Sequence, residues 1–192
     1  MFAELFKKYG CDKERCHRYG IAYDALLLPY LDRRIKLLEI GIDRGASLRC
    51  WREALPRADV WAIDIDVGSL QHVPEGVHGI IGSQYNDTFL RSVTNSVGGW
   101  WDVVIDDGSH LIHHQRFTFD YLWPSIRPGG LYIIEDLESS KMRPAKYNPQ
   151  ELETTLDWAM RTARDGVRRR AGGVPTPLIT FFRELVALRK AT

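Results

Sequence analysis

Two kinds of hydrophobic pattern alternate along the chain. Hydrophobic residues recur at the spacing of one helical face over residues 2–9 and again over 23–30, which predicts two N-terminal helices. Further on, five short apolar runs are typical of strands buried on both faces: KLLEIGI, VWAIDID, VHGIIGS, WDVVIDD and GLYIIED. Helical patterns lie between these runs. We therefore expect an α/β fold with a doubly wound, mainly parallel sheet.

The chain has the size of one domain. Its 192 residues are 44% hydrophobic and 27% charged, which suits one globular core and excludes a disordered or fibrous class. We expect residues 1–34 to form an N-terminal helical lid and residues 35–192 to form the core. The polar segment 138–150, with two prolines, is expected to be a mobile surface loop. A helix should follow with Leu152 as its first apolar residue, and the tail 177–190 fits either an amphipathic helix or a long strand.

Charge and cysteine content indicate which binding partners and which cellular compartment to expect. The 26 basic and 25 acidic residues leave a net charge of +1, so no basic surface indicates nucleic acid or an anionic membrane, and a small neutral substrate fits better. Arginines between residues 161 and 170 could hold an acidic substrate, but a solvated helix end explains them better. The first ten residues are too charged for a signal peptide, and no run approaches the roughly 20 apolar residues that span a bilayer. Three cysteines without C-x-x-C spacing suit reduced thiols, so we expect a cytoplasmic protein.

The first candidate site follows the first predicted strand. Glu39 ends that strand, and Gly41 and Gly45 form a turn. A helix then begins near Ser47. Glycines let a ligand approach the backbone closely, and the start of a helix offers free amide donors. The spacing is G-x-x-x-G rather than the G-x-G-x-x-G of dinucleotide-binding proteins, which argues against a pyrophosphate cofactor.

Polar residues at the ends of later strands extend this site. Asp64 ends the second strand about 20 residues after the turn, where a carboxylate can accept hydrogen bonds from both hydroxyls of a ribose. A ribose without a pyrophosphate suggests S-adenosylmethionine as the cofactor. Ser83 and Gln84 could bond the adenine edge, Asp106 could serve the cofactor side, and Tyr19 in the expected lid could close over the cofactor. The alternative is an ordinary strand-to-helix turn with a solvated acidic end.

The second candidate site joins the fourth and fifth predicted strands. The run WDVVIDDGSH places Asp107 and His110 after the fourth strand, and Glu135 and Asp136 end the fifth. Ligands of doubly wound sheets bind outside the carboxyl ends of the strands, and carboxylates that converge there would repel one another. A hard divalent cation such as Mg²⁺ would relieve that repulsion and leave positions open for substrate. The alternative is that these acids only cap helices or stay solvated.

Three stretches resemble the class I, magnesium-dependent sugar O-methyltransferases: YGCDKERCHRYGIAYDALL, LLEIGIDRGASLRCWREALPRADVWAIDID and VVIDDGSHLIHHQRFTFDYLWPSIRPGGLYIIEDLESS. That family includes macrolide and aminocoumarin sugar O-methyltransferases, and it is similar to enzymes that methylate mannosides in mycobacterial methylmannose polysaccharide. The resemblance covers roughly residues 8–140. It implies a Rossmann-like fold of the class I methyltransferase type, in which the tail contributes a late sheet strand.

The resemblance also implies roles for the acids and the histidine. Asp107, Glu135 and Asp136 would hold the metal, and His110 would be the general base. Two departures bear on the substrate: Cys11 stands where the family often has threonine, and family members usually carry longer insertions that cover the substrate.

The expected reaction is methyl transfer from S-adenosylmethionine to a hydroxyl of a small saccharide or glycoside. An alcohol is too weak an acid to ionise unaided near neutral pH, so Mg²⁺ would lower the pKa of the hydroxyl and His110 would take the proton. Three alternatives stay open: a metal-dependent hydroxylase, a catechol-type O-methyltransferase, and a cofactor-binding module without turnover. A nicotinamide reductase is excluded because its fingerprint is absent. We expect no nucleic-acid or membrane partner, and a homodimer is compatible with the sequence.

Overall fold

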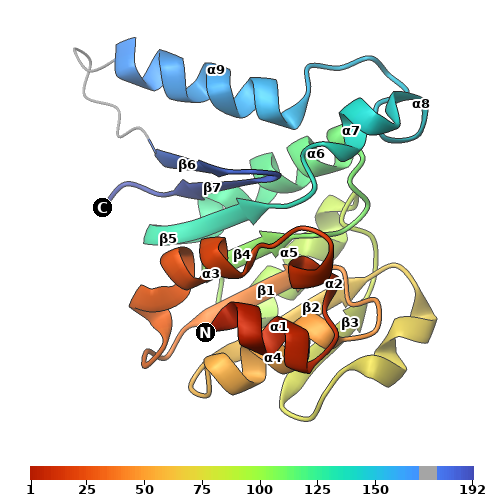
Figure 1. The fold of residues 1–192 in the computed structure, drawn as a ribbon, viewed down its shortest axis with the longest axis vertical. Helices are drawn as coiled ribbons and strands as arrows, with labels where there is room; N and C mark the ends of the chain where they lie inside the picture. The colour runs from red at the N-terminus through yellow and green to blue at the C-terminus, as the bar shows by residue number, and fades with distance from the viewer. Residues whose placement is uncertain (169–176) are drawn as a thin grey trace.

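The computed structural model describes residues 1–168 and 177–192. Its centre is a seven-stranded sheet with the strand order β3-β2-β1-β4-β5-β7-β6 (Figure 1). The strands are β1 (Lys36–Ile40), β2 (Asp59–Asp64), β3 (Val77–Ile81), β4 (Trp101–Asp106), β5 (Ile126–Ile134), β6 (Leu178–Phe182) and β7 (Leu185–Arg189). The α-helices are α1 (Phe2–Lys8), α2 (Asp12–Arg15), α3 (Gly20–Leu27), α4 (Ala46–Ala54), α5 (Asp87–Ser96), α6 (Ile112–Leu122), α7 (Ser139–Met142), α8 (Pro144–Tyr147) and α9 (Thr155–Arg168). Short 3-10 segments are η1 (Leu28–Tyr30), η2 (Val67–His72) and η3 (Trp123–Ser125).

The sheet topology creates a crevice next to its first strand. Strands β1 to β5 are parallel, β7 runs antiparallel to β5, and β6 runs antiparallel to β7. The chain passes from β1 outward to β3 and then returns to place β4 on the other side of β1. Ligands of such sheets bind where the strand order reverses, outside the carboxyl ends of the strands. The expected doubly wound, mainly parallel sheet is confirmed.

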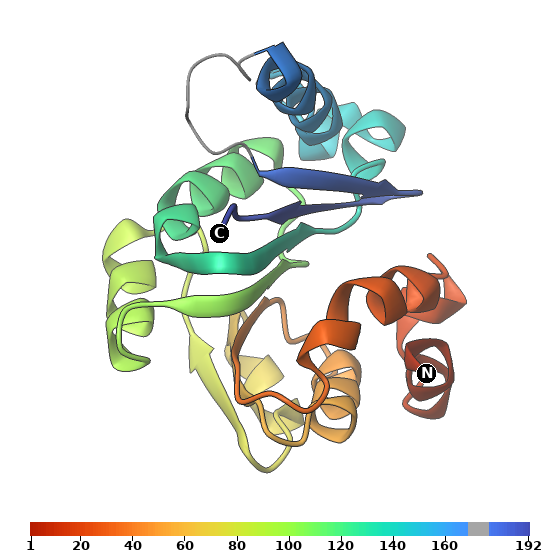
Figure 2. The same cartoon turned by 90° about the vertical axis from the view of Figure 1, so that its left-hand side faces the viewer.

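Helices cover both faces of the sheet (Figures 1 and 2). On one face α1, α3 and α4 pack on a cluster that includes Leu37 of β1 and Trp51 of α4. On the other face α5, α6 and α9 pack on a cluster that includes Leu38 of β1 and Phe119 of α6. Successive residues of β1 thus serve opposite clusters, because strand side chains alternate between the two faces. This explains why the strands appear in the sequence as continuous apolar runs.

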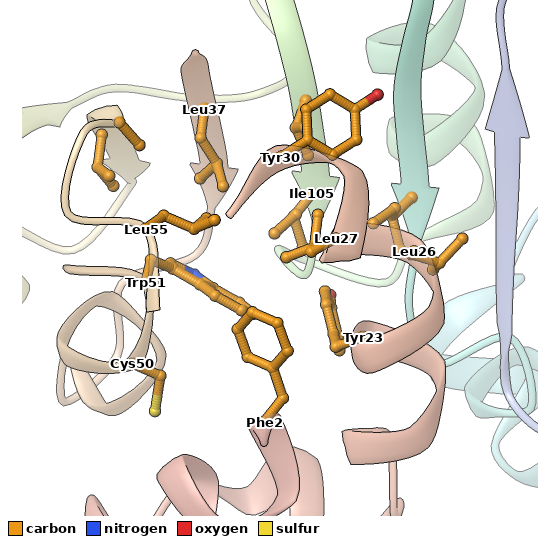
Figure 3. Close-up of a cluster of buried hydrophobic side chains, with 14 of the residues drawn as sticks. Phe2, Tyr23, Leu26, Leu27, Tyr30, Leu37, Cys50, Trp51, Leu55 and Ile105 are labelled. Atoms are coloured by element: carbon orange, nitrogen blue, oxygen red, sulfur yellow. The ribbon is translucent and has the colours of Figure 1, made fainter. Parts of the chain in front are cut away.

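The N-terminal helices are part of the hydrophobic core. The rings of Phe2 and Tyr23 lie against the buried indole of Trp51, with centroid separations of 5.6 and 5.0 Å (Figure 3). Loss of a buried aromatic side chain costs about 3–5 kcal/mol of stability, so these contacts hold the segment firmly. Residues 1–34, the expected lid, are therefore anchored to the core by these aromatic contacts.

Two sequence expectations need correction. Segment 138–150 is not a loop throughout, because α7 and α8 each form a helical turn within it. Pro144 is the first residue of α8, where its fixed φ suits a helix start and its missing N–H is not needed. The tail is neither a helix nor one long strand, because the chain reverses at residues 183 and 184 to make the hairpin of β6 and β7. The strand that the resemblance implied is present, and a second one accompanies it.

The helix expected after segment 138–150 is present as α9, which begins at Thr155, so Leu152 precedes it. Within the arginine-rich stretch, Arg161 donates two hydrogen bonds to Glu153, at 2.8 and 2.7 Å. Residues 169 and 170 of that stretch lie outside the described residues. Among the helices that the structure describes, none combines the length and the apolar character needed to cross a lipid bilayer.

Candidate active site

The turn after β1 requires glycine at two positions. Gly41 has a φ of +101° and Gly45 a φ of +66°, values that residues with a side chain rarely adopt. A Cβ atom on Gly41 would overlap the carbonyl oxygen of Asp107, and one on Gly45 would overlap that of His72. The turn therefore lies directly against the backbone that follows β4. This close approach brings the two sites expected from the sequence into one place.

Glu39 stabilises the helix that follows the turn. Its side chain is fully buried, and Oε2 accepts hydrogen bonds from Ser47 Oγ and Trp51 Nε1, both at 2.8 Å. Burial raises the pKa of Glu39 to about 7, although the ammonium group of Lys13 opposes the shift. Glu39 thus fixes the start of α4, which carries the free amide groups of the predicted cofactor site.

Asp64 holds the same turn from the neighbouring strand. Its Oδ2 accepts the backbone N–H of Ile42 at 2.8 Å and that of Asp43 at 3.3 Å. Its Oδ1 accepts the backbone N–H of Asp66 at 2.9 Å. A carboxylate has about four lone-pair sites, so Asp64 keeps acceptor capacity for the hydroxyls of a ligand. Asp64 thus lies at the strand end where the sequence placed it and also shapes the turn, and its bond to a ribose stays a prediction.

One cavity of about 650 Å³ joins the two predicted sites. From the cofactor set, its lining includes Gly41, Ser47, Asp64, Ser83 and Gln84. From the acidic set, its lining includes Asp107, His110 and Asp136. The remaining predicted residues are not part of this lining: Tyr19, Glu39, Gly45, Asp106 and Glu135. We call the two parts of the cavity the cofactor end, next to Gly41 and Asp64, and the acidic end, next to Asp107 and Asp136.

Gln84 lines the cavity and is hydrogen-bonded to the fully buried Asp106. Gln84 Nε2 donates to Asp106 Oδ1 and to Thr118 Oγ1, both at 3.1 Å. Its Oε1 accepts the backbone N–H of Ser109 at 2.8 Å. Asp106 also accepts from the hydroxyl of Tyr132 at 3.2 Å, and burial raises the pKa of Asp106 to about 6 despite these bonds. Both amide hydrogens of Gln84 are used within the protein, so a direct bond to the adenine edge stays a prediction.

At the acidic end, His110 lies between two carboxylates. Its Nε2 is 3.9 Å from Asp107 Oδ1 and 3.6 Å from Asp136 Oδ2. His110 and Asp136 have φ values of 56° and 57°, in the left-handed region that is uncommon for residues with a side chain. Backbone strain of this kind persists where the surrounding structure demands it and is concentrated at functional sites. The fold thus holds these two side chains toward each other.

Lys13, which the sequence pattern does not single out, lies among three of the buried or half-buried acids. Its side chain is buried, and Nζ donates to Asp107 Oδ2 and to both carboxylate oxygens of Glu135, the latter at 2.9 and 2.8 Å. Glu39 Oε1 is 3.6 Å from the same nitrogen, and the hydroxyl of Tyr23 donates to Glu135. Burial alone would lower the pKa of Lys13, but the charges of Asp107 and Glu135 outweigh it and raise that pKa well above its ordinary value. No periodicity or spacing distinguishes this lysine from a solvated one.

Two further residues of the N-terminal segment contact the acidic end. The Tyr19 hydroxyl donates to Asp136 Oδ1 at 3.0 Å and to the carbonyl oxygen of Glu184 at 3.2 Å. His17 stacks on Tyr19 and places Nδ1 2.8 Å from Glu184 Oε2. Tyr19 was expected to close over the cofactor. The structure places it behind Asp136 instead, where it orients a predicted metal ligand.

The donor set at the acidic end suits a hard divalent cation. Single ligand atoms of Asp107, His110 and Asp136 lie within 4.8 Å of one another. The two carboxylate oxygens that face His110, Oδ1 of Asp107 and Oδ2 of Asp136, accept no hydrogen bond from residues 1–168 or 177–192. Oxygen ligands of this kind are those that Mg²⁺ prefers. Asp107 and Asp136 therefore fit the predicted metal, whereas both oxygens of Glu135 face Lys13 and its role as a ligand stays a prediction.

Known proteins are similar to this chain in sequence and in fold. It is 37% identical over 145 residues to 8-demethyl-8-alpha-L-rhamnosyl tetracenomycin-C 2'-O-methyltransferase from Streptomyces olivaceus, a match that covers 72% of this chain and 38% of the relative. It is 37% identical over 144 residues to mycinamicin VI 2''-O-methyltransferase from Micromonospora griseorubida, covering 70% of this chain and 35% of the relative. The chain thus spans little more than a third of the length of these relatives.

A solved structure extends the likeness to nearly the whole chain. MycE methyltransferase from the mycinamycin biosynthetic pathway, in complex with Mg, S-adenosylhomocysteine (SAH) and mycinamycin VI, superposes with a TM-score of 0.85 and 28% sequence identity. The match covers 99% of this chain and 53% of that one. A family model described as a methyltransferase domain matches residues 38–137, which is more than half of the 192 residues. The chain therefore belongs to this family of methyltransferase domains.

Proposed function

We propose that this protein is an S-adenosylmethionine-dependent and Mg²⁺-dependent O-methyltransferase that methylates a sugar hydroxyl of a glycosylated natural product. The observation that carries the proposal is the single cavity that joins the glycine turn and Asp64 to Asp107, His110 and Asp136. A methyl donor and a hydroxyl acceptor have to meet in one space for direct transfer. This cavity provides an acceptor for ribose hydroxyls at one end and a proton acceptor at the other.

At the cofactor end, the protein offers backbone and carboxylate groups to an adenosyl ligand. The left-handed glycines keep side chains away from the turn, and Ser47 lies at the start of α4. Asp64 can accept from the ribose hydroxyls while it holds the amides of the turn. These groups position the cofactor, which brings its own reactive methyl group.

At the acidic end, the residues present suit proton removal from an acceptor hydroxyl. Mg²⁺, when held by Asp107 and Asp136, would supply positive charge that favours the ionised form of that hydroxyl. His110 lines the cavity between these carboxylates, so its neutral imidazole can accept the proton. The ring of Tyr147 on α8 lies 6.1 Å from that of His110, edge to face.

The substrate class is proposed from the relatives. The two curated relatives named above are described as 2'- and 2''-O-methyltransferases of a rhamnosyl tetracenomycin and of a mycinamicin. A demethylmacrocin O-methyltransferase from Streptomyces fradiae is 36% identical over 143 residues. We extend to this chain only their common feature, a glycosylated natural product. Residues 1–34 would cover the site as its lid, and the unpaired Cys11, Cys16 and Cys50 suit the reducing cytoplasm.

The test is methyl transfer from labelled S-adenosylmethionine by the full chain. Acceptors would include a rhamnosylated aromatic polyketide, a macrolide glycoside, free deoxyhexoses and a catechol, each with Mg²⁺, with EDTA, and with EDTA followed by excess Mg²⁺. We expect label in a sugar hydroxyl of a glycoside, loss of turnover in EDTA, and recovery with Mg²⁺. Full activity in EDTA would contradict the metal assignment, and transfer to the catechol alone would support the catechol-type alternative. Cofactor binding without transfer to any acceptor would support the binding module.

A further inference from the structure

The peptide group between Glu135 and Asp136 lies where the chain leaves β5. Glu135 still donates its backbone N–H to the carbonyl oxygen of Asp106, at 3.0 Å. Asp136 has a φ of 57°, so the extended conformation ends there. Consecutive side chains of a regular strand point to opposite faces of the sheet. Two consecutive acids can therefore serve one site only where the strand conformation ends, as it does here.

Both of these carboxylates belong to the acidic end. Glu135 and Asp107 share the ammonium group of Lys13, and Asp136 and Asp107 lie on either side of the imidazole of His110. Asp107, Glu135 and Asp136 are also the three acids to which the resemblance assigns the metal. The conformation of the turn after β5 thus decides where two of the three predicted ligands lie.

Two buried side chains hold the peptide group by its two polar atoms. Gln115 of α6 donates from Nε2 to the carbonyl oxygen of Glu135, at 3.3 Å. The hydroxyl oxygen of Tyr19 accepts the backbone N–H of Asp136, also at 3.3 Å. Gln115 is 2% exposed and Tyr19 is 1% exposed, so water does not compete for these bonds. A left-handed residue with a side chain persists where its surroundings impose that conformation, and these two bonds do so.

Thr155 completes the support of Gln115. The carbonyl oxygen of Glu135 can only accept, so the amide of Gln115 has to present its nitrogen to that oxygen. The amide oxygen then faces Thr155, whose hydroxyl donates to it at 2.6 Å. Thr155 is the first residue of α9 and is 2% exposed. The hydrogen bonds thus run from α9 through α6 to the turn after β5.

We propose that Gln115 is a positioning residue for the acidic end: with Thr155, it fixes the peptide group between Glu135 and Asp136 and so directs both carboxylates toward the divalent ion. The inference rests on the proposed function for the presence of that ion. Groups that orient metal ligands contribute to metal affinity without touching the metal. Gln115 does not line the cavity, so its loss should leave the affinity for S-adenosylmethionine unchanged.

The experiment measures Mn²⁺ binding by electron paramagnetic resonance, S-adenosylmethionine affinity by calorimetry, and thermal unfolding. Gln115→Met keeps the length of the side chain but cannot donate to the carbonyl of Glu135. Thr155→Val keeps the shape and removes the hydroxyl, whereas Thr155→Ser keeps the hydroxyl. We expect Gln115→Met to bind Mn²⁺ about 10-fold to 100-fold more weakly, the usual loss when a group that orients a metal ligand is removed. Thr155→Val should weaken binding by a smaller factor, and Thr155→Ser should bind like the parent.

The matched control is Thr94→Val. Thr94 is 6% exposed and accepts from Trp101 Nε1 at 3.2 Å, and neither residue lines the cavity. This variant should lose thermal stability but bind Mn²⁺ like the parent. Parent affinity in Gln115→Met, or in Thr155→Val where Gln115→Met does not fold, would overturn the proposal, and so would an equal loss of affinity in Thr94→Val. Absence of Mn²⁺ binding by the parent would contradict the proposed function, and this inference with it.

Discussion

The two ends of the cavity are built in different ways. At the cofactor end, the main contacts join residues close in sequence: Ser47 bonds Glu39 eight residues away, and Ile42 bonds Asp64 across 22 residues. At the acidic end, Lys13 bonds Glu135 across 122 residues and His17 bonds Glu184 across 167. One end is a local strand-turn-helix unit, and the other is assembled from the whole fold.

The difference also separates two kinds of interaction. The cofactor end relies on backbone amides, glycine conformations and one carboxylate, which remain in place whenever the first two strands pair. The acidic end relies on charges that have to be balanced in a buried setting. We therefore expect substitutions at the acidic end to lower the rate of methyl transfer and those at the cofactor end to lower the affinity for the cofactor. Neither kind of substitution should have much effect on the other quantity.

The largest expected effect is on His110. His110→Ala should lower the single-turnover rate of methyl transfer by about 100-fold to 10,000-fold, the usual contribution of a positioned base. The affinity for S-adenosylmethionine, measured by calorimetry, should stay unchanged, because the cofactor end is built independently. The matched control is His78→Ala, since His78 is an exposed histidine that stacks on Trp61 away from the cavity. A near-parent rate in His110→Ala would remove the histidine from the mechanism, and a large loss of cofactor affinity would break the separation of the two ends.

A smaller effect should come from Glu39, which accepts a hydrogen bond from Ser47 at the cofactor end and lies 3.6 Å from Lys13 at the acidic end. Its pKa is about 7 in the folded protein against an ordinary 4.5, so between these values the unfolded chain loses the proton first. The folded state then binds more protons, and the free energy of unfolding should fall by about 3 kcal/mol as the pH rises from 4 to 8. Urea unfolding of the parent and of Glu39→Gln across this range should show a flatter profile for the variant. Glu75→Gln, at an exposed site, should keep the parent slope. Equal slopes in all three proteins would show that Glu39 does not contribute.

The smallest effect should follow the loss of Asp64. Asp64→Ala should weaken binding of S-adenosylmethionine by about 1–3 kcal/mol, the scale of a hydrogen bond lost from a partner that stays buried. Mn²⁺ affinity should not change, because the Asp64 side chain bonds backbone N–H groups of Ile42, Asp43 and Asp66 and none of the acidic-end side chains among the described residues. Asp120→Ala, on the exposed side of α6, is the control for calorimetry. Unchanged cofactor affinity in Asp64→Ala would place the ribose elsewhere.

The outcome for particular residues follows the same division. The turn at Gly41 and Gly45 and the place of Asp64 at a strand end could be predicted from the sequence, because both leave local signals in residue type and spacing. Their roles in cofactor binding stay predictions. That Asp107 and Asp136 lie close together could be predicted because the carboxyl ends of parallel strands meet at one edge of the sheet. Their role as metal ligands stays a prediction. Gln84 and Tyr19 were placed near the site, but the bonds of their side chains depend on neighbours that the local pattern does not contain.

By itself, the sequence determined the alternation of strands and helices, the mainly parallel character of the sheet and the two groups of strand-end residues. These properties depend on side-chain periodicity and on backbone conformations that a few neighbouring residues dictate. Only the tertiary structure decided that Lys13 lies among the acids and that the tail forms a hairpin. The physical reason is that a lysine in a short N-terminal helix and a lysine in a charged core look alike in the sequence, because the partners that bury it are supplied by segments about a hundred residues away.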